Sequence, residues 1–147
     1  MSVDSLSKPA RRAIFEALVA MAWADARLER EEIFAVQAAG RVLHLPEDAL
    51  DALDAGPPTI DDIVSAELSS GDRRIVYTCA AWLARVDDRE DSSEAKLLDA
   101  LRTGLDLDED DAHTLREDAH MLHVTTPSST PWWQEIELLI ERVIAPQ

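Results

Sequence analysis

The 147-residue chain is poor in cysteine, glycine and aromatic residues: it has one cysteine and four glycines, and aromatic residues make up 5% of it. A single cysteine, Cys79, excludes an internal disulfide and a cysteine-rich metal site. No run approaches ~18 uninterrupted apolar residues, so the sequence predicts no membrane insertion. The first residues show no charged and then apolar signal region, and we therefore expect a cytoplasmic protein.

Basic residues are also scarce. Acids outnumber bases 30 to 14, for a formal net charge of −16. Binding to a phosphate backbone needs clustered Lys and Arg, so the composition argues against a nucleic-acid partner. It favours a protein partner with a basic surface, a divalent cation, or only high solubility. Residues 87–118 carry thirteen acids and four bases, a net charge of −9, and should form most of the acidic surface.

Strand signals are nearly absent, and apolar residues recur at helical spacing, which predicts an all-α fold. Ser7 and Pro9 should open a first helix, and Ser69 should cap a later one. Gly104 is expected to stop the helix marked by Leu97, Leu98 and Leu101, as a C-terminal glycine. The last helix should run from about Trp132 to Ile144.

The chain contains an internal repeat at a period of 62 residues. Residues 6–50 align with 68–112 without a gap, and 13 of the 45 positions are identical, where random matching would give roughly three to five. We interpret this as a duplication. The prediction is one domain over residues 1–147, a compact helical bundle of two helical hairpins related by a pseudo-two-fold axis. Residues 126–147 form a C-terminal extension.

An acidic loop recurs in both copies. Oxygen-rich loops suit hard cations such as calcium or magnesium, although the spacing is not that of an EF-hand. The candidate metal ligands are Asp25, Glu32, Asp87, Asp88, Glu90, Asp91 and Glu94. The alternative is capping, in which these carboxylates accept hydrogen bonds from free backbone N–H groups at a helix start.

The string AMAWADARLEREE, from Ala20 to Glu32, resembles the signature of the TerB-like, tellurite-resistance family. In that family an Ala-rich helix end is followed by Asp-Gly, an apolar residue and a Glu. Here Ala26 and Asp88 stand at the Gly position, and Glu90 stands at the apolar position of the second copy. The resemblance covers about residues 6–125. It implies an all-helical domain with two related halves, with Asp25, Glu32, Asp87 and Glu94 on the motif.

The same resemblance implies a function. TerB-like proteins are small bacterial cytosolic modules linked to chemical stress and tellurite resistance. They are thought to act by binding, with metal binding suspected, and not by catalysis. The sequence itself has no Gly-rich phosphate loop, nucleophile elbow or catalytic triad motif, so we expect a non-catalytic module that acts through its acidic surface.

Two further groups of residues leave alternatives open. His113, Glu117 and His120 share one helical face, which His123 continues, and they could hold a transition metal or form a solvated polar face. Trp132 and Trp133 could anchor the last helix or bind a partner. The chain could therefore be a metal-handling protein or metalloenzyme, or an adaptor docking through its C-terminal Trp helix. Cys79 lies among apolar residues and should be a buried small hydrophobe.

Overall fold

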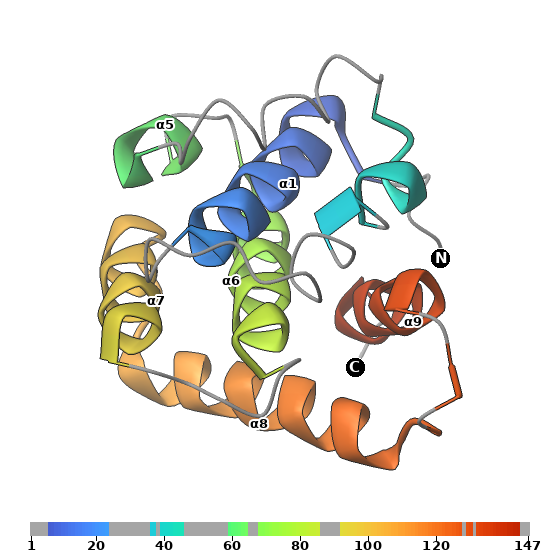
Figure 1. Cartoon of the computed structure of the whole chain (residues 1–147). Helices are drawn as coiled ribbons and strands as arrows, with labels where there is room; N and C mark the ends of the chain where they lie inside the picture. The colour runs from blue at the N-terminus through green and yellow to red at the C-terminus, as the bar shows by residue number, and fades with distance from the viewer. Residues whose placement is uncertain are drawn as a thin grey trace.

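The computed structural model describes residues 6–23, 36–37, 39–45, 59–64, 68–85, 92–127, 129–130 and 132–144, and the regular secondary structure in these ranges is helical (Figure 1). The fold is therefore an all-α, compact bundle, as the sequence predicts. Its helices are α1 (Lys8–Ala22), α5 (Ile60–Val64), α6 (Ser70–Arg85), α7 (Ser92–Gly104), α8 (Glu109–Thr125) and α9 (Trp132–Ile144). None of the described helices is long and apolar enough to cross a membrane.

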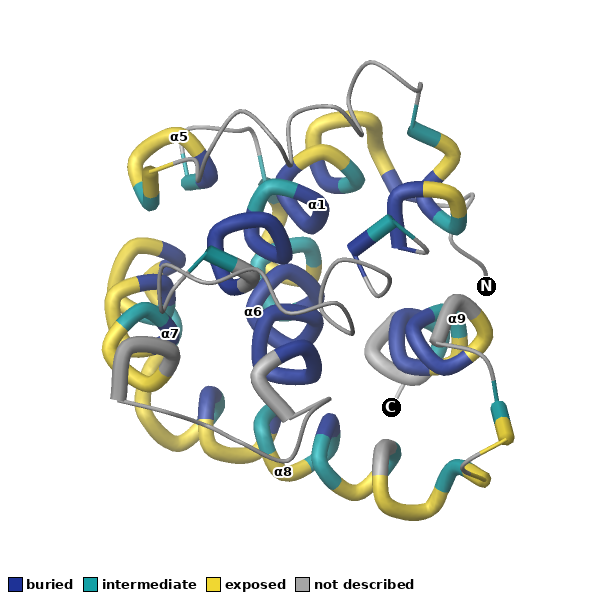
Figure 2. Tube along the Cα trace, viewed as in Figure 1, coloured by how far each residue is buried: buried dark blue, intermediate teal, exposed yellow. Residues whose placement is uncertain are grey.

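Helix α6 forms the centre of the bundle. It packs against α1, α7, α8 and α9, and every residue from 75 to 83 is buried (Figure 2). Trp82 and Tyr77 are the largest of its fully buried side chains, and α1 contributes Ile14 and Leu18 to the same core. A helix that is apolar on all sides is stable only when other helices cover it, so α6 fixes the positions of its neighbours.

The two long helices of the repeat begin in the same way. The Ser7 hydroxyl accepts a hydrogen bond from the backbone N–H of Ala10 at 3.2 Å, and the Ser69 hydroxyl accepts one from Asp72 at 3.1 Å. Each serine thereby satisfies a backbone donor that the helix itself leaves free. Both N-caps are confirmed, and α1 and α6, the equivalent helices of the two copies, pack directly against each other.

The helices that close each copy also end alike. His44 and Asp106 have positive φ angles of 58° and 59°. In both turns the N–H of this residue bonds a carbonyl three residues back, and the next N–H bonds one five residues back, which is a Schellman motif. The bonds are His44 to Arg41 (3.1 Å), Leu45 to Gly40 (3.0 Å), Asp106 to Thr103 (3.1 Å) and Leu107 to Arg102 (3.1 Å).

The role expected of Gly104 needs correction. Helix α7 does end at Gly104, but the left-handed residue of the turn is Asp106. A Cβ atom on Gly104 would lie 3.0 Å from Ile60 Cγ2 and 3.1 Å from Val64 Cγ1. The glycine therefore allows α5 to pack closely on the last turn of α7, which a sequence pattern does not distinguish from a helix stop.

Helix α9 covers another side of α6. It spans Trp132–Ile144, the predicted range, and Ile136, Leu139 and Ile140 are fully buried. Trp82 is fully buried in α6, and Trp23 packs against the core from the end of α1. The helices α7 and α8 remain more exposed on their outer sides (Figure 2), and the most acidic part of the sequence lies there.

Candidate functional site

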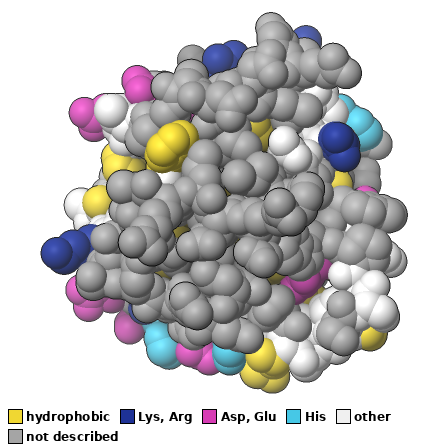
Figure 3. All heavy atoms as spheres, viewed as in Figure 1, with side chains coloured by type: hydrophobic (Ala, Val, Ile, Leu, Met, Phe, Trp, Pro, Cys, Tyr) yellow, Lys and Arg dark blue, Asp and Glu magenta, His cyan; other side chains and the backbone are white. Residues whose placement is uncertain are grey.

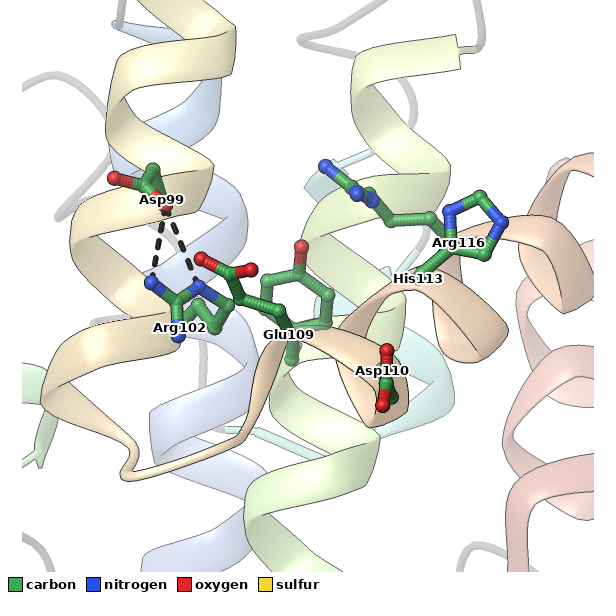
Figure 4. Close-up of a pocket in the computed structure, with 7 residues that line it drawn as sticks. Asp99, Arg102, Glu109, Asp110, His113 and Arg116 are labelled. Carbon is green, nitrogen blue, oxygen red and sulfur yellow. Dashed lines mark hydrogen bonds and ion pairs between the residues drawn. The ribbon is translucent and has the colours of Figure 1, made fainter.

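A pocket of about 360 Å³ lies where α7 and α8 meet over α6 (Figure 4). Tyr77 of α6, itself buried, contributes to its lining. The other lining residues are charged or titratable side chains of α7 and α8: Asp99, Arg102, Glu109, Asp110, His113 and Arg116. The pocket therefore lies within the segment that carries most of the net negative charge.

Arg102 holds the α7 side of the pocket in place. Its Nε and Nη2 atoms each donate to Asp99 Oδ1 at 3.3 Å, and Nη1 donates to the Leu107 carbonyl oxygen at 3.0 Å. The Arg102 side chain is 21% exposed, whereas that of Asp99 is 74% exposed. Arg102 thus uses its donors to fix the turn that leads from α7 into α8, while Asp99 remains open to solvent.

The first turn of α8 is fixed by two aspartates that stand three residues apart. Asp108 caps the helix by accepting a hydrogen bond from the Asp111 backbone N–H at 2.7 Å. The Asp111 carboxylate pairs with Arg74 Nη1 of α6 at 3.4 Å. Arg73 instead donates to the Leu105 carbonyl oxygen at 3.3 Å. These contacts tie the start of α8, and the turn that precedes it, to α6.

Between these two aspartates, Glu109 and Asp110 are exposed and line the pocket, and the Glu109 side chain extends toward Arg102 of α7 (Figure 4). Neither side chain makes a hydrogen bond or ion pair with any residue that the structure describes. Negative charge at a helix N-terminus is favoured by the helix dipole. Their carboxylate oxygens nevertheless remain available to a positively charged ligand.

Arg116 and His113 line the same pocket from the next turns of α8. The Arg116 side chain extends from α8 toward α7, whereas the His113 ring points away from α7 (Figure 4). Arg116 forms no ion pair within the described ranges. Among the residues that the structure describes, Glu109, Asp110 and Arg116 thus keep their charged groups without partners at the pocket, an arrangement suited to binding charged side chains.

The predicted metal ligands fall almost wholly outside the described residues. This applies to Asp25, Glu32, Asp87, Asp88, Glu90 and Asp91. Glu94 lies in the first turns of α7, but its side chain is outside the description. Among the side chains that are described, no group of three or more His, Cys, Asp or Glu residues could hold a metal ion. The calcium or magnesium site stays a prediction.

The histidine face of α8 is partly described. His113 and Glu117 are exposed, and His120 is half-buried, with its Nδ1 atom buried and without a hydrogen-bond partner. The side chain of His123 lies outside the description, as do those of Trp132 and Trp133 at the start of α9. The partner-binding role of the two tryptophans therefore remains untested.

Cys79 is a buried apolar residue, as predicted. It lies in α6 with no exposed surface, and burial raises the pKa of its thiol to about 12. Because the thiolate is the reactive form of cysteine, this thiol is protonated at neutral pH. Cys79 thus serves the packing of the core and does not act as a nucleophile.

Sequence reasoning did not identify the α7–α8 pocket. Its sequence signal is the spacing of three between Asp99 and Arg102, and between Asp110, His113 and Arg116, which places each set on one helical face. That the two faces meet over Tyr77 depends on the packing of three helices. No family model, curated protein or solved structure matches the chain, so its function must be argued from its own residues.

Proposed function

We propose that this protein is a non-catalytic binding module that holds a basic segment of a protein partner at the junction of α7 and α8. The observation that carries the proposal is the pair of exposed carboxylates of Glu109 and Asp110 at the pocket, which have no partner among the described residues. Asp99 lines the same pocket, and the exposed residues Asp106 and Asp108 stand next to this pair in the sequence; we call these five residues the acidic face.

Electrostatics favours a basic protein segment as the ligand of this face. Clustered carboxylates attract Lys and Arg side chains and steer a basic partner toward the site. A nucleic acid would be repelled by the same charges. The free Arg116 guanidinium adds specificity, because it can pair with a carboxylate of the partner that lies next to the basic residues.

The resemblance of residues 20–32 to the TerB-like signature supports a place for this module in a bacterial chemical-stress or tellurite-resistance system. Members of that family are thought to act by binding, which agrees with an exposed acidic face and with a buried, protonated Cys79. The partner would then be another protein of the same stress system. The acidic loops and the Trp helix stay alternative contact regions.

The proposal is tested by fluorescence anisotropy with a short labelled peptide rich in Lys and Arg. The protein should bind it with an affinity that falls as NaCl rises, because salt screens exposed charges. Glu109→Gln combined with Asp110→Asn should weaken binding at least about five-fold, or roughly 1 kcal/mol. An acidic peptide of equal length should not bind.

The matched control is Asp61→Asn combined with Glu137→Gln, which removes the same two charges from α5 and α9. Asp61 also lies in the first turn of its helix, so the loss of helix-dipole stabilisation is similar. The control should bind as the parent does. Equal weakening by both pairs would mean that only net charge matters, and the proposed site would be wrong.

A further inference from the structure

A line of exposed side chains leads from the pocket along the outside of α8. It consists of Asp110, His113, Glu117, Met121 and Val124, which we call the α8 stripe. All five residues are exposed. Their spacings of three or four residues place them on one helical face. Asp110 and His113 also line the pocket, so the stripe is continuous with the acidic site.

The far end of the stripe is apolar. Met121 is 49% exposed and Val124 is 55% exposed, and with Leu138 of α9 they are the exposed large hydrophobic residues of the described ranges. In Figure 3 acidic and histidine side chains, and then hydrophobic ones, follow one another along the edge where α8 runs in Figure 1. Single exposed apolar residues are ordinary, but here two lie on adjacent turns and continue a charged binding face.

We propose that the α8 stripe binds an amphipathic helix of the partner, with basic residues at one end of its contact face and apolar residues at the other. This inference rests on the proposed function and specifies the partner. The acidic end at Asp110 and Glu117 selects Lys and Arg, and the apolar end at Met121 and Val124 selects residues such as Leu or Ile.

The geometry of the stripe favours a helical ligand. Residues 110 and 124 are separated by fourteen residues of helix, or about 21 Å at 1.5 Å per residue. A partner helix of about four turns covers this length. Helices recognise such surfaces through anchors at positions i, i+3, i+4 and i+7.

Charge complementarity disfavours the other occupants of an exposed apolar face. A second copy of this chain would bring two acidic faces together, because residues 87–118 carry a net charge of −9. An anionic membrane surface would repel the same residues. Self-association and membrane binding are both measurable, and each would appear as a distinct experimental outcome.

The test uses two labelled helical peptides that differ at one set of positions. The amphipathic peptide carries Arg and Lys on the first two turns of one face and Leu on the next two, and the basic peptide has Gln in place of each Leu. Met121→Gln combined with Val124→Gln should weaken binding of the amphipathic peptide roughly ten-fold. The same variant should bind the basic peptide as the parent does.

The control is Leu138→Gln, which removes the exposed apolar side chain of α9 and should leave both affinities unchanged. Gln is a good helix former, so α8 should persist, as circular dichroism will show. If the parent binds both peptides equally, or if Met121 and Val124 do not matter, the amphipathic helix is wrong while the acidic site stands. If neither peptide binds, the proposed function itself fails.

Two further measurements identify the other occupants. Sedimentation of the unliganded protein should show one species whose mass does not change with protein concentration. Met121 and Val124 should therefore not mediate self-association. Self-association that Met121→Gln with Val124→Gln abolishes would assign the stripe to a second copy. Co-sedimentation with phosphatidylglycerol vesicles should show no binding, and binding that the same variant abolishes would likewise overturn the proposal.

Discussion

His44 and Asp106 lie 62 residues apart and adopt the same left-handed conformation, with φ angles of 58° and 59°. Each ends its helix with the same pair of backbone hydrogen bonds. The spacing equals the period of the sequence repeat, and the Ser7 and Ser69 caps repeat at the same period. Because non-glycine residues rarely adopt positive φ, this coincidence supports the interpretation that the two segments arose by duplication.

The strain at Asp106 gives the first prediction. Asp106→Gly should raise the free energy of unfolding by roughly 0.5–1 kcal/mol, because glycine adopts positive φ without steric cost. Asp106→Val should lower it, because a β-branched side chain is disfavoured there. Urea denaturation measures both. If Asp106→Gly lowers the free energy of unfolding, the aspartate side chain stabilises the turn by more than its positive φ angle destabilises it.

Gly104 should tolerate alanine less well than Gly71. A Cβ atom at Gly104 would meet Ile60 and Val64 at 3.0 and 3.1 Å, whereas at Gly71 its nearest neighbour would be Ser69 Oγ at 3.8 Å. Gly71→Ala should be neutral or stabilise by up to ~1 kcal/mol, since alanine favours the helix. Gly104→Ala should be less stable than Gly71→Ala by about 1–2 kcal/mol. Equal thermal stabilities of the two variants would contradict the close packing of α5 on α7.

The Cys79 thiol should make stability depend on pH above 9. Its pKa rises from 9.0 to about 12 on folding, so the folded state holds the proton more tightly than the unfolded state does. The stabilisation is complete below pH 9 and is lost as the pH rises toward 12. The free energy of unfolding should therefore fall more steeply over this range in the parent than in Cys79→Ala. Parallel curves in urea titrations would contradict the burial of the thiol.

The acidic loop at residues 87–94 yields a prediction from sequence alone. Calcium should raise the melting temperature more than NaCl of matched ionic strength does, by an amount that corresponds to about 2.7 kcal/mol at a hundred-fold excess over Kd. Asp87→Ala combined with Glu94→Ala should abolish this increment, while Asp51→Ala combined with Asp54→Ala should retain it. If calcium acts alike on all three proteins, the carboxylates are helix caps and not ligands.

Much of the fold follows from local signals in the sequence. The N-cap serines and the bounds of α9 were predicted from residues next to one another in the chain, because capping and helical periodicity are local effects. Cys79 was assigned to the core because apolar residues surround it on one helix. These assignments needed no knowledge of how the helices are arranged.

What the sequence did not reveal depends on contacts between helices. In the sequence, Gly104 has the pattern of a glycine that ends a helix. Only the short distance from a Cβ atom at this position to Ile60 identifies it as a site of close packing. In the sequence, Arg102 and Arg116 resemble ordinary surface charges. In the structure Arg102 fixes the turn into α8, and Arg116 lines the pocket. A pocket formed by three helices has no single sequence motif, so its residues could not be grouped in advance.

Backbone-amide NMR can locate directly the surface at which a basic segment binds to the acidic face of α7 and α8. The ¹⁵N-labelled protein is titrated with the amphipathic peptide, and the shifted amides are mapped on the structure. The largest shifts should cluster at Asp99, Glu109, Asp110, His113 and Glu117, with smaller ones at Met121 and Val124. Shifts concentrated on α1, α5 or α9, with α7 and α8 unchanged, would contradict binding at the acidic face.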